Sequence, residues 1–318
     1  MSVPNARSKV VDLLQFITPD GNKYDLHNVP KRAVTLVEGF GLPPQVINST
    51  SGPYQHGEDV LSYRLSPRDV NVTIRHNACS KDDYWTYRDT LIDTLGLQRT
   101  DPNNPVEGTL RRIYYINGVR KTRDLKVLLT SGLKYIAPPN DKWDQWGINE
   151  ELVFRAHNPI IYDPTQITST ITTFTSSLRF PFVFPFVLGN FTGTTTINYA
   201  GTWFEYPTIV ITGPATDVTI HNTTTDKFIR LSGTIPVAET VTIDLTYGAK
   251  TVTGTHGEDL LGYITPESNL GDFSLLHDPL VSNGQNIINV YAYDTSFGAG
   301  EVYTTSIAIK YYNRYIGI

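Results

Sequence analysis

The chain has 318 residues, of which 40% are hydrophobic and 11% aromatic, which is enough material for two separate cores. Its net charge of −5 and pI near 5.8 exclude the broad basic surface of dedicated nucleic-acid binders. A single cysteine, Cys79, excludes an intramolecular disulfide, and residues 1–7 lack an apolar signal core, so we expect folding in a reducing cytosol. The most apolar run, 180–191, contains Pro181 and Pro185 and is too short to cross a bilayer, so no membrane insertion is expected.

The first half predicts short strands joined by tight turns. Pro19-Asp20-Gly21 favours a turn and so predicts a hairpin of 9–17 with 22–27; a second hairpin is predicted for 109–116 with 119–130, and single strands for 32–38 and 148–156. Asn117-Gly118 suits the type I′ turn of the second hairpin. Gly39 to Pro44 is interpreted as a turn, because it lacks the third glycine of a dinucleotide fingerprint and its prolines would block the phosphate-binding helix.

Residues 52–77 are the expected centre of this first domain. The segments 60–65 and 70–75 each alternate with the period of half-buried strands, and Ser66-Pro67-Arg68-Asp69 between them favours a turn, so a hairpin is predicted. A short helix should follow, capped by Asp82 or Asp83 and ended by Gly96 in the left-handed conformation. Its expected apolar face comprises Tyr84, Tyr87, Leu91 and Leu95.

Residues 165–177 carry serine or threonine at nearly every position, which predicts an extended polar connector or edge segment at a domain boundary. We therefore expect two domains, 1–164 and 165–318. The second should be a β-sandwich with one helical turn near 266–270. Its predicted strands are 180–188, 194–199, 207–212, 218–222, 228–232, 240–246, 250–255, 273–276, 286–293 and 303–312.

Motifs in both halves resemble one known family. In the first half they are Gly52-Pro53-Tyr54-Gln55-His56-Gly57-Glu58, Tyr63-Arg64-Leu65, Arg68, Tyr84-Trp85, Arg88 and Asn158-Pro159 to Tyr162. In the second half they are Arg179 to Phe186, Pro207 to Pro214, Leu260-Leu261-Gly262-Tyr263, Pro266 to Leu270, Phe273 and Tyr311 to Tyr315. Together they resemble the siphovirus distal tail proteins over nearly the whole chain and in the same order.

The resemblance implies a structural virion protein with two mainly β domains. Its N-terminal domain, 1–164, would form a hexameric ring, and its C-terminal domain, 165–318, would be a galectin-like β-sandwich. The ring would join the tail tube protein to a tail-tip or tail-associated lysin protein, anchor receptor-binding or side-fibre proteins, and let DNA pass through its lumen. The acidic balance suggests a neutral or negative lumen, since basic walls would hold phosphates. Exposed strand edges in 9–38 and 109–130 are the expected ring contacts.

No catalytic residue, metal site or cofactor is predicted. His256-Gly257-Glu258-Asp259-Leu260-Leu261-Gly262-Tyr263 matches residues 56–63 at six of eight positions, but adjacent Glu and Asp in an extended segment point to opposite faces, so turn chemistry is expected. The chain has no Gly-x-Ser-x-Gly elbow, and Cys79 beside His76 and Asp82 is a weak basis for a thiol nucleophile. We therefore expect no enzymatic activity.

Two alternatives stay open. The first is a carbohydrate-binding attachment module that recognises host surface glycans, with Trp203 and Tyr206 as the candidate sugar contacts, because Trp203, Phe204 and Tyr206 lie close together and exposed aromatic rings stack on sugars. Aromatic clusters in sandwiches are also common core features, and Pro207 places Tyr206 at the start of a strand. The second is the same architecture in a gene transfer agent, a prophage remnant or a related injection device.

Overall fold

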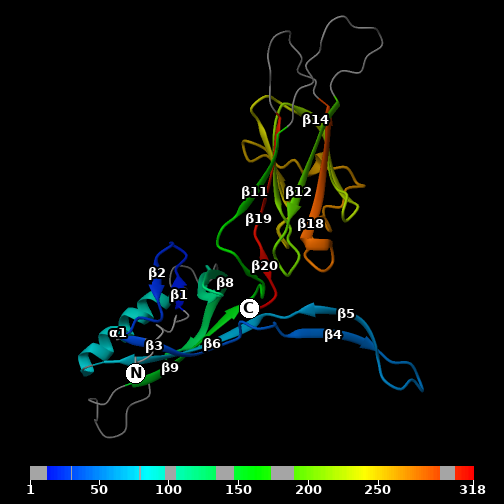
Figure 1. The fold of residues 1–318 in the computed structure, drawn as a ribbon. Helices are drawn as coiled ribbons and strands as arrows, with labels where there is room; N and C mark the ends of the chain where they lie inside the picture. The colour runs from blue at the N-terminus through cyan, green and yellow to red at the C-terminus, as the bar shows by residue number, and fades with distance from the viewer. Residues whose placement is uncertain are drawn as a thin grey trace, which may run out of the picture. The chain divides into compact units, whose positions relative to one another are not determined.

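The computed structural model describes residues 13–29, 31–78, 80–96, 105–133, 147–172, 190–293 and 305–318. The fold is mainly β, as predicted, and forms two compact units, residues 1–164 together with 315–318 (unit 1) and residues 165–314 (unit 2) (Figure 1). The predicted strand 180–188 and residues 9–12 of the first hairpin lie outside the described residues, as does Cys79. Within the described ranges, no helix combines the length and apolarity needed to span a membrane.

Unit 1 is built on a nine-stranded sheet with the order β2-β1-β7-β8-β9-β6-β3, to which β10 and β20 are added. Its core forms because alternate side chains point to the same face of each strand, and Val70, Val72 and Ile74 are all fully buried. The strands are β1 (Leu13–Ile17), β2 (Lys23–Asp25), β3 (Arg32–Glu38), β6 (Arg68–Asn77), β7 (Gly108–Ile116), β8 (Val119–Gly132), β9 (Gly147–Ala156), β10 (Ile161–Tyr162) and β20 (Arg314–Tyr315).

Both outer hairpins predicted for unit 1 are confirmed over their described residues. β1 pairs antiparallel with β2, and β7 pairs antiparallel with β8 from Gly108 to the turn. In that turn Asn117 has φ 50° and Gly118 has φ 79°, the two positive values that a type I′ turn requires. Within the expected ring-contact edge 109–130, β7 is hydrogen-bonded over 109–113 to β1 on one side and to β8 on the other, so that stretch is not a free edge, and the ring contact itself stays a prediction.

The predicted central hairpin is wrong. β5 (Asp59–Leu65) does not pair with β6 but with β4 (Gln45–Thr50), forming a separate two-stranded ribbon, the β4–β5 ribbon, which extends away from the sheet of unit 1 (Figure 1). β6 is paired on both sides, with β3 and β9. The period of two marked both segments as strands but did not show that only β6 has a buried face. No residue of β5 is fully buried, so β5 has no core face to share with β6.

Helix α1 (Lys81–Leu95) follows β6, with Tyr84, Leu91 and Leu95 buried as predicted and Tyr87 partly buried. Its N-cap is Ser80, whose Oγ accepts a hydrogen bond from the Asp83 backbone N–H at 3.1 Å, so the predicted cap at Asp82 or Asp83 is wrong. The prediction that Gly96 ends the helix in the left-handed conformation is also wrong. Gly96 has φ −73° and still donates to the Ile92 carbonyl at 2.7 Å, which continues the helical bonding.

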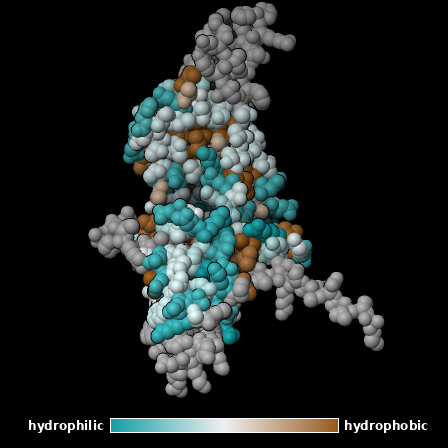
Figure 2. Space-filling model, turned by 90° about the vertical axis from the view of Figure 1, so that its left-hand side faces the viewer, coloured by the Kyte–Doolittle hydropathy of each residue, from teal (hydrophilic) through white to brown (hydrophobic). Residues whose placement is uncertain are grey.

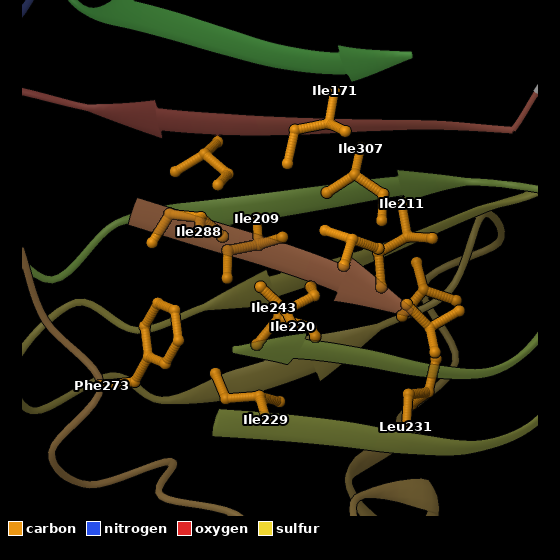
Figure 3. Packing of buried hydrophobic residues seen from close by; sticks show 14 of the residues in the cluster. Ile171, Ile209, Ile211, Ile220, Ile229, Leu231, Ile243, Phe273, Ile288 and Ile307 are labelled. Carbon is orange, nitrogen blue, oxygen red and sulfur yellow. The ribbon is translucent and has the colours of Figure 1, made fainter. Parts of the chain in front are cut away.

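Unit 2 is the predicted β-sandwich, with sheet orders β11-β19-β13-β16-β17 and β12-β18-β14-β15. Isoleucines from both sheets meet in one core, among them Ile209 and Ile243 from the first sheet and Ile220 and Ile288 from the second, with Phe273 at one side (Figure 3). The strands are β11 (Ile167–Thr172), β12 (Asn190–Asn198), β13 (Thr208–Thr212), β14 (Ala215–Asn222), β15 (Lys227–Ile235), β16 (Thr240–Asp244), β17 (Thr251–Thr253), β18 (Gln285–Tyr293) and β19 (Ser306–Tyr311).

Two local predictions in unit 2 are wrong. The expected strand 273–276 makes only an isolated bridge, Leu275 with Glu205. The expected helical turn at 266–270 instead runs beside β15, where Thr265 N–H donates to the Arg230 carbonyl at 3.0 Å and Asn269 N–H donates to the Phe228 carbonyl at 2.8 Å. The segment also makes turn bonds of its own, from the Ser268 N–H to the Thr265 carbonyl at 3.0 Å and from the Phe273 N–H to the Asn269 carbonyl at 2.9 Å, but they do not build a helix at 266–270. The 3₁₀ turns lie at η3 (Leu261–Tyr263) and η4 (Ser282–Gly284).

Candidate functional site

The two predicted sugar-contact residues, Trp203 and Tyr206, are both partly buried in unit 2 and have different neighbours. Trp203 packs edge-on against Phe204, with ring centroids 5.3 Å apart. Tyr206 packs against the core, 6.3 Å from the ring of Tyr247, with Lys250 Nζ 4.9 Å from its own centroid. Tyr247 is 81% exposed and therefore presents the most accessible ring of this group. The sequence analysis missed it because β13 to β16 separate it from Tyr206 along the chain.

The repeated His-Gly-Glu-Asp motif is used for local turn bonds. In the second copy Glu258 Oε2 accepts from the His256 backbone N–H at 2.9 Å, and Asp259 Oδ1 accepts from the Leu261 backbone N–H at 2.9 Å. In the first copy Glu58 accepts from the Ser49 hydroxyl, and Asp59 Oδ2 accepts from the Gln55 side chain at 3.0 Å. Over the described ranges, no three His, Cys, Asp or Glu side chains gather as a metal site would require.

Unit 1 contains a buried polar cluster that the sequence analysis did not find. Glu150 on β9 is only 3% exposed, and its Oε1 accepts hydrogen bonds from the Tyr84 hydroxyl at 2.7 Å and from Arg88 Nη1 at 2.6 Å. His76 on β6 lies with its Nε2 3.5 Å from Glu150 Oε2. Arg88 also donates to the Leu133 carbonyl. The cluster therefore joins α1 to the two strands beneath it, with its charged groups removed from solvent.

The electrostatics of this cluster follow from burial and pairing. Burial by itself would raise the pKa of Glu150, but the nearby His76, Tyr84 and Arg88 favour the carboxylate strongly enough to lower it. Burial, together with donation to Glu150, raises the pKa of the Tyr84 hydroxyl to about 12. Both groups therefore hold one protonation state at neutral pH, and the arrangement is suited to fixing the helix rather than to transferring protons.

Glu150 predicts an acid limit on the stability of unit 1. Because its folded-state pKa is lowered, the stabilisation from its ionised form is present above the unfolded-state pKa and is lost as the pH falls through the folded value. We expect the thermal unfolding midpoint of unit 1 to fall below about pH 4.5, the ordinary pKa of a glutamate. Melting curves between neutral and acid pH would measure this decline, which should be shallower in Glu150→Gln. Equal slopes in both proteins would contradict the assignment.

The β4–β5 ribbon carries an exposed apolar face. Ile47 pairs with Tyr63, and Val60 pairs with Ser49, which lies two residues from Ile47 on β4, so Ile47, Tyr63 and Val60 lie on one face. These three side chains are 57%, 56% and 67% exposed, respectively. The opposite face is mixed, with Asn48, Ser62 and Arg64 beside Val46, and Leu61 is the extra residue where the register shifts. Elsewhere, on the side of the molecule drawn in Figure 2, hydrophobic residues form small groups separated by hydrophilic ones.

This geometry defines a class of protein: a mainly β chain of two units whose described polar clusters brace the fold and whose β4–β5 ribbon has an uncovered apolar face. Residues 200–315 match the family model of the siphovirus-type tail component, C-terminal domain. The Dit protein of phage SPP1, described as a hub of the adsorption apparatus in phages that infect Gram-positive bacteria, has a similar fold. That similarity has a TM-score of 0.58 at 14% identity and covers 94% of this chain and 98% of that one.

A structure of the phage P2 baseplate in its activated conformation with calcium also matches, at a TM-score of 0.47 and 10% identity, over 94% of this chain and 98% of that chain. No curated protein matches the sequence. The family model spans about a third of the chain, and this match agrees with the siphovirus resemblance noted from the sequence motifs. The likeness to the SPP1 Dit structure is one of fold.

Proposed function

We propose that this chain assembles into a hexameric ring at the distal end of a phage tail and acts there as a structural part rather than as an enzyme. The observation that carries self-assembly is the exposed apolar face of the β4–β5 ribbon. A two-stranded ribbon is marginally stable alone in water, and a contiguous apolar face on it is the mark of a protein contact. A second copy of the same chain is the partner that a ring supplies at every position.

The ribbon also suits a ring geometrically. It extends to one side of unit 1, away from α1 and the edge strand β2 (Figure 1). A contact between a projecting element and a different surface of the next copy is head-to-tail, and such contacts close into rings when the rotation between copies permits. The number six is carried over from the family resemblance.

The other roles proposed for the ring also rest on the family. The ring would join the tail tube protein to a tail-tip or tail-associated lysin protein, and unit 2 would anchor receptor-binding or side-fibre proteins. DNA would cross the lumen in transit. The net charge of −5 favours a neutral or negative lumen wall, which would not retain the phosphate backbone. The chain would be made and assembled in the host cytoplasm.

Native mass spectrometry of the purified chain, with negative-stain imaging of the same sample, tests the ring. We expect a species of six copies that images as a closed ring. A dimer, or an open filament that grows with concentration, would contradict the proposal. A monomer at every concentration would count against self-assembly of the free protein and would favour the second candidate below.

The second candidate function is binding of a host surface glycan by unit 2. It is favoured by one observation, the pair of Tyr206 and the 81% exposed Tyr247, with the Lys250 ammonium over the Tyr206 ring. An exposed aromatic ring can stack on the C–H face of a sugar, and a neighbouring ammonium can donate to its hydroxyls. Lys250 Nζ already donates to the carbonyls of Leu270 and Gly271, which holds it in place. Of the two residues predicted from sequence, this candidate keeps Tyr206 and replaces Trp203 by Tyr247.

A glycan array followed by titration of any hit tests this candidate. We expect Tyr247→Ala to weaken glycan binding about fivefold or more, through the loss of one stacking contact. Tyr291→Ala is the matched control, since Tyr291 is also partly exposed, at 45%, but lies on the other sheet of the sandwich. Equal loss in both variants, or no glycan bound by the unsubstituted chain, would rule out a sugar site at Tyr247.

A further inference from the structure

The last residues of the chain, 315–318, pack into unit 1 although the sequence that precedes them belongs to unit 2. Their backbone is held by Arg68, which is 1% exposed. Arg68 Nη2 donates to the Ile316 carbonyl at 2.6 Å, and its Nη1 donates to the carbonyls of Gly39 at 3.2 Å and Gly41 at 2.9 Å. In addition, the Ile318 N–H donates to the Phe40 carbonyl at 3.0 Å.

These contacts fall at the base of the β4–β5 ribbon. Residues 39–44 form the link from β3 into β4, and Arg68 is the first residue of β6, two positions beyond Ser66, which follows β5. Ser66 N–H donates to the Pro44 carbonyl at 2.8 Å and so joins the two limbs where the ribbon leaves the sheet. The 315–318 segment is therefore bonded to the link into the ribbon and, through Arg68, to the strand that leaves it.

At the ribbon base the backbone of residues 315–318 packs directly against the backbone of the 39–44 link. A Cβ on Gly317 would lie 2.8 Å from the Gly41 carbonyl oxygen, and a Cβ on Gly39 would lie 2.2 Å from the Asp69 carbonyl oxygen. Gly39 also has φ +100°, which non-glycine residues rarely adopt. The 39–44 link therefore cannot shift past residues 315–318, or past Asp69, without moving one of these backbone contacts.

Arg68 joins residues 315–318 to the 39–41 link through three hydrogen bonds. Its three acceptors in the described part of the chain are backbone carbonyls, so the buried guanidinium depends on their hydrogen bonds to compensate for lost hydration. Burial lowers its pKa to about 10. Without Ile316, one buried donor loses its acceptor, and the side chain gains by moving towards solvent. The carbonyls of Gly39 and Gly41 would then lose the group that holds them.

The tail has its own anchor at Tyr315. The Arg123 guanidinium lies 3.8 Å from the centroid of the Tyr315 ring, and the Tyr315 hydroxyl donates to Asp163 Oδ2 at 3.2 Å. Arg123 and Asp163 also form an ion pair with each other. These three interacting side chains thus hold the first residue of 315–318 in place.

We infer that residues 315–318 are a positioning brace for the β4–β5 ribbon. Arg68 connects this brace to the ribbon. Because it is hydrogen-bonded both to residues 315–318 and to the 39–41 link, it sets the direction in which the ribbon leaves unit 1. The ribbon can then meet a neighbouring copy at a defined angle only while the tail is in place. The effect on assembly rests on the proposed ring, whereas the effect on the ribbon itself does not.

Hydrogen–deuterium exchange of the full-length chain tests the brace at a dilution where it is monomeric. We expect Gly317→Val and Arg68→Met each to speed amide exchange in residues 45–65 about tenfold, while β7 to β9 keep their protection. Gly271→Val is the matched control, because a Cβ there meets nothing within 4 Å. Unchanged exchange at 45–65 in both variants would overturn the brace, and so would equal loosening of β7 to β9, since that would show general destabilisation.

Native mass spectrometry of the same variants separates the brace from the proposed ring. If the unsubstituted chain forms a ring and both variants lose most of it, the brace acts on assembly as inferred. If the unsubstituted chain forms no ring but the variants still loosen the ribbon, the brace stands and the ring proposal fails. If the variants loosen the ribbon yet assemble as well as the unsubstituted chain, the positioning role in assembly is refuted.

Discussion

Replacing Ile47 and Val60 together by aspartate is expected to abolish ring assembly while the chain still folds. Both side chains lie on the exposed apolar face of the β4–β5 ribbon, at 57% and 67% exposure, so neither contributes to the core of unit 1. Burying two carboxylates in a contact between copies would cost several kcal/mol, enough to lower the assembled fraction by orders of magnitude. Unfolding free energies should change by about 0.5 kcal/mol or less per site, as for other exposed positions. Native mass spectrometry and denaturant titration measure the two effects.

The opposite face of the same ribbon supplies the control. Val46 and Ser62 lie on that face and are both exposed, and the double aspartate variant there adds the same charge to the same two strands. We expect it to keep the ring. If both double variants lose the ring equally, charge or fraying of the ribbon is the cause. If the Ile47 and Val60 variant assembles normally, the apolar face is not the contact between copies.

Arg88→Met is expected to destabilise unit 1 by about 3–5 kcal/mol, because it leaves the Glu150 carboxylate buried without its cationic partner. The Arg88 side chain is 8% exposed and that of Glu150 2%, so water cannot replace the lost guanidinium without opening the α1 interface. Adding Glu150→Leu should recover most of this loss, since removing both charges leaves no unpaired ion. Chemical denaturation followed by a double-mutant cycle measures the coupling between the two residues.

The exposed pair of Arg155 and Asp69 is the matched comparison within the same sheet. Its nitrogen and oxygen lie 3.9 Å apart, and the two side chains are 46% and 52% exposed. Such pairs contribute about 0–1 kcal/mol, so Asp69→Asn should hardly change stability. A similar cost for Arg88→Met and Asp69→Asn would mean that the Glu150 cluster is solvated in solution and does not hold α1 as described.

The elements predicted correctly from the sequence were those whose physical cause is local. Asn117-Gly118 determined its hairpin because these residues tolerate the positive φ values of a type I′ turn, at 50° and 79°. The strand β3 and most strands of the sandwich were found as short runs of strand-forming residues between turn formers, which are also local signals. The helix was found from its apolar spacing, although its cap at Ser80 was missed in favour of nearby acidic residues that also suit an N-terminus.

The pairings between distant segments were decided by the tertiary structure. The alternation in 60–65 could not show that β5 would pair with β4, because period two marks a strand but carries no information about its partner. Nor could it show that Glu150 would meet Tyr84 and Arg88, which come from a different element. The sequence by itself determined the β class, most strands and the family motifs, because these depend on neighbouring residues. Only the fold brought Ile316 to Arg68 and left one face of the ribbon uncovered, because both depend on which surfaces remain after the cores have formed.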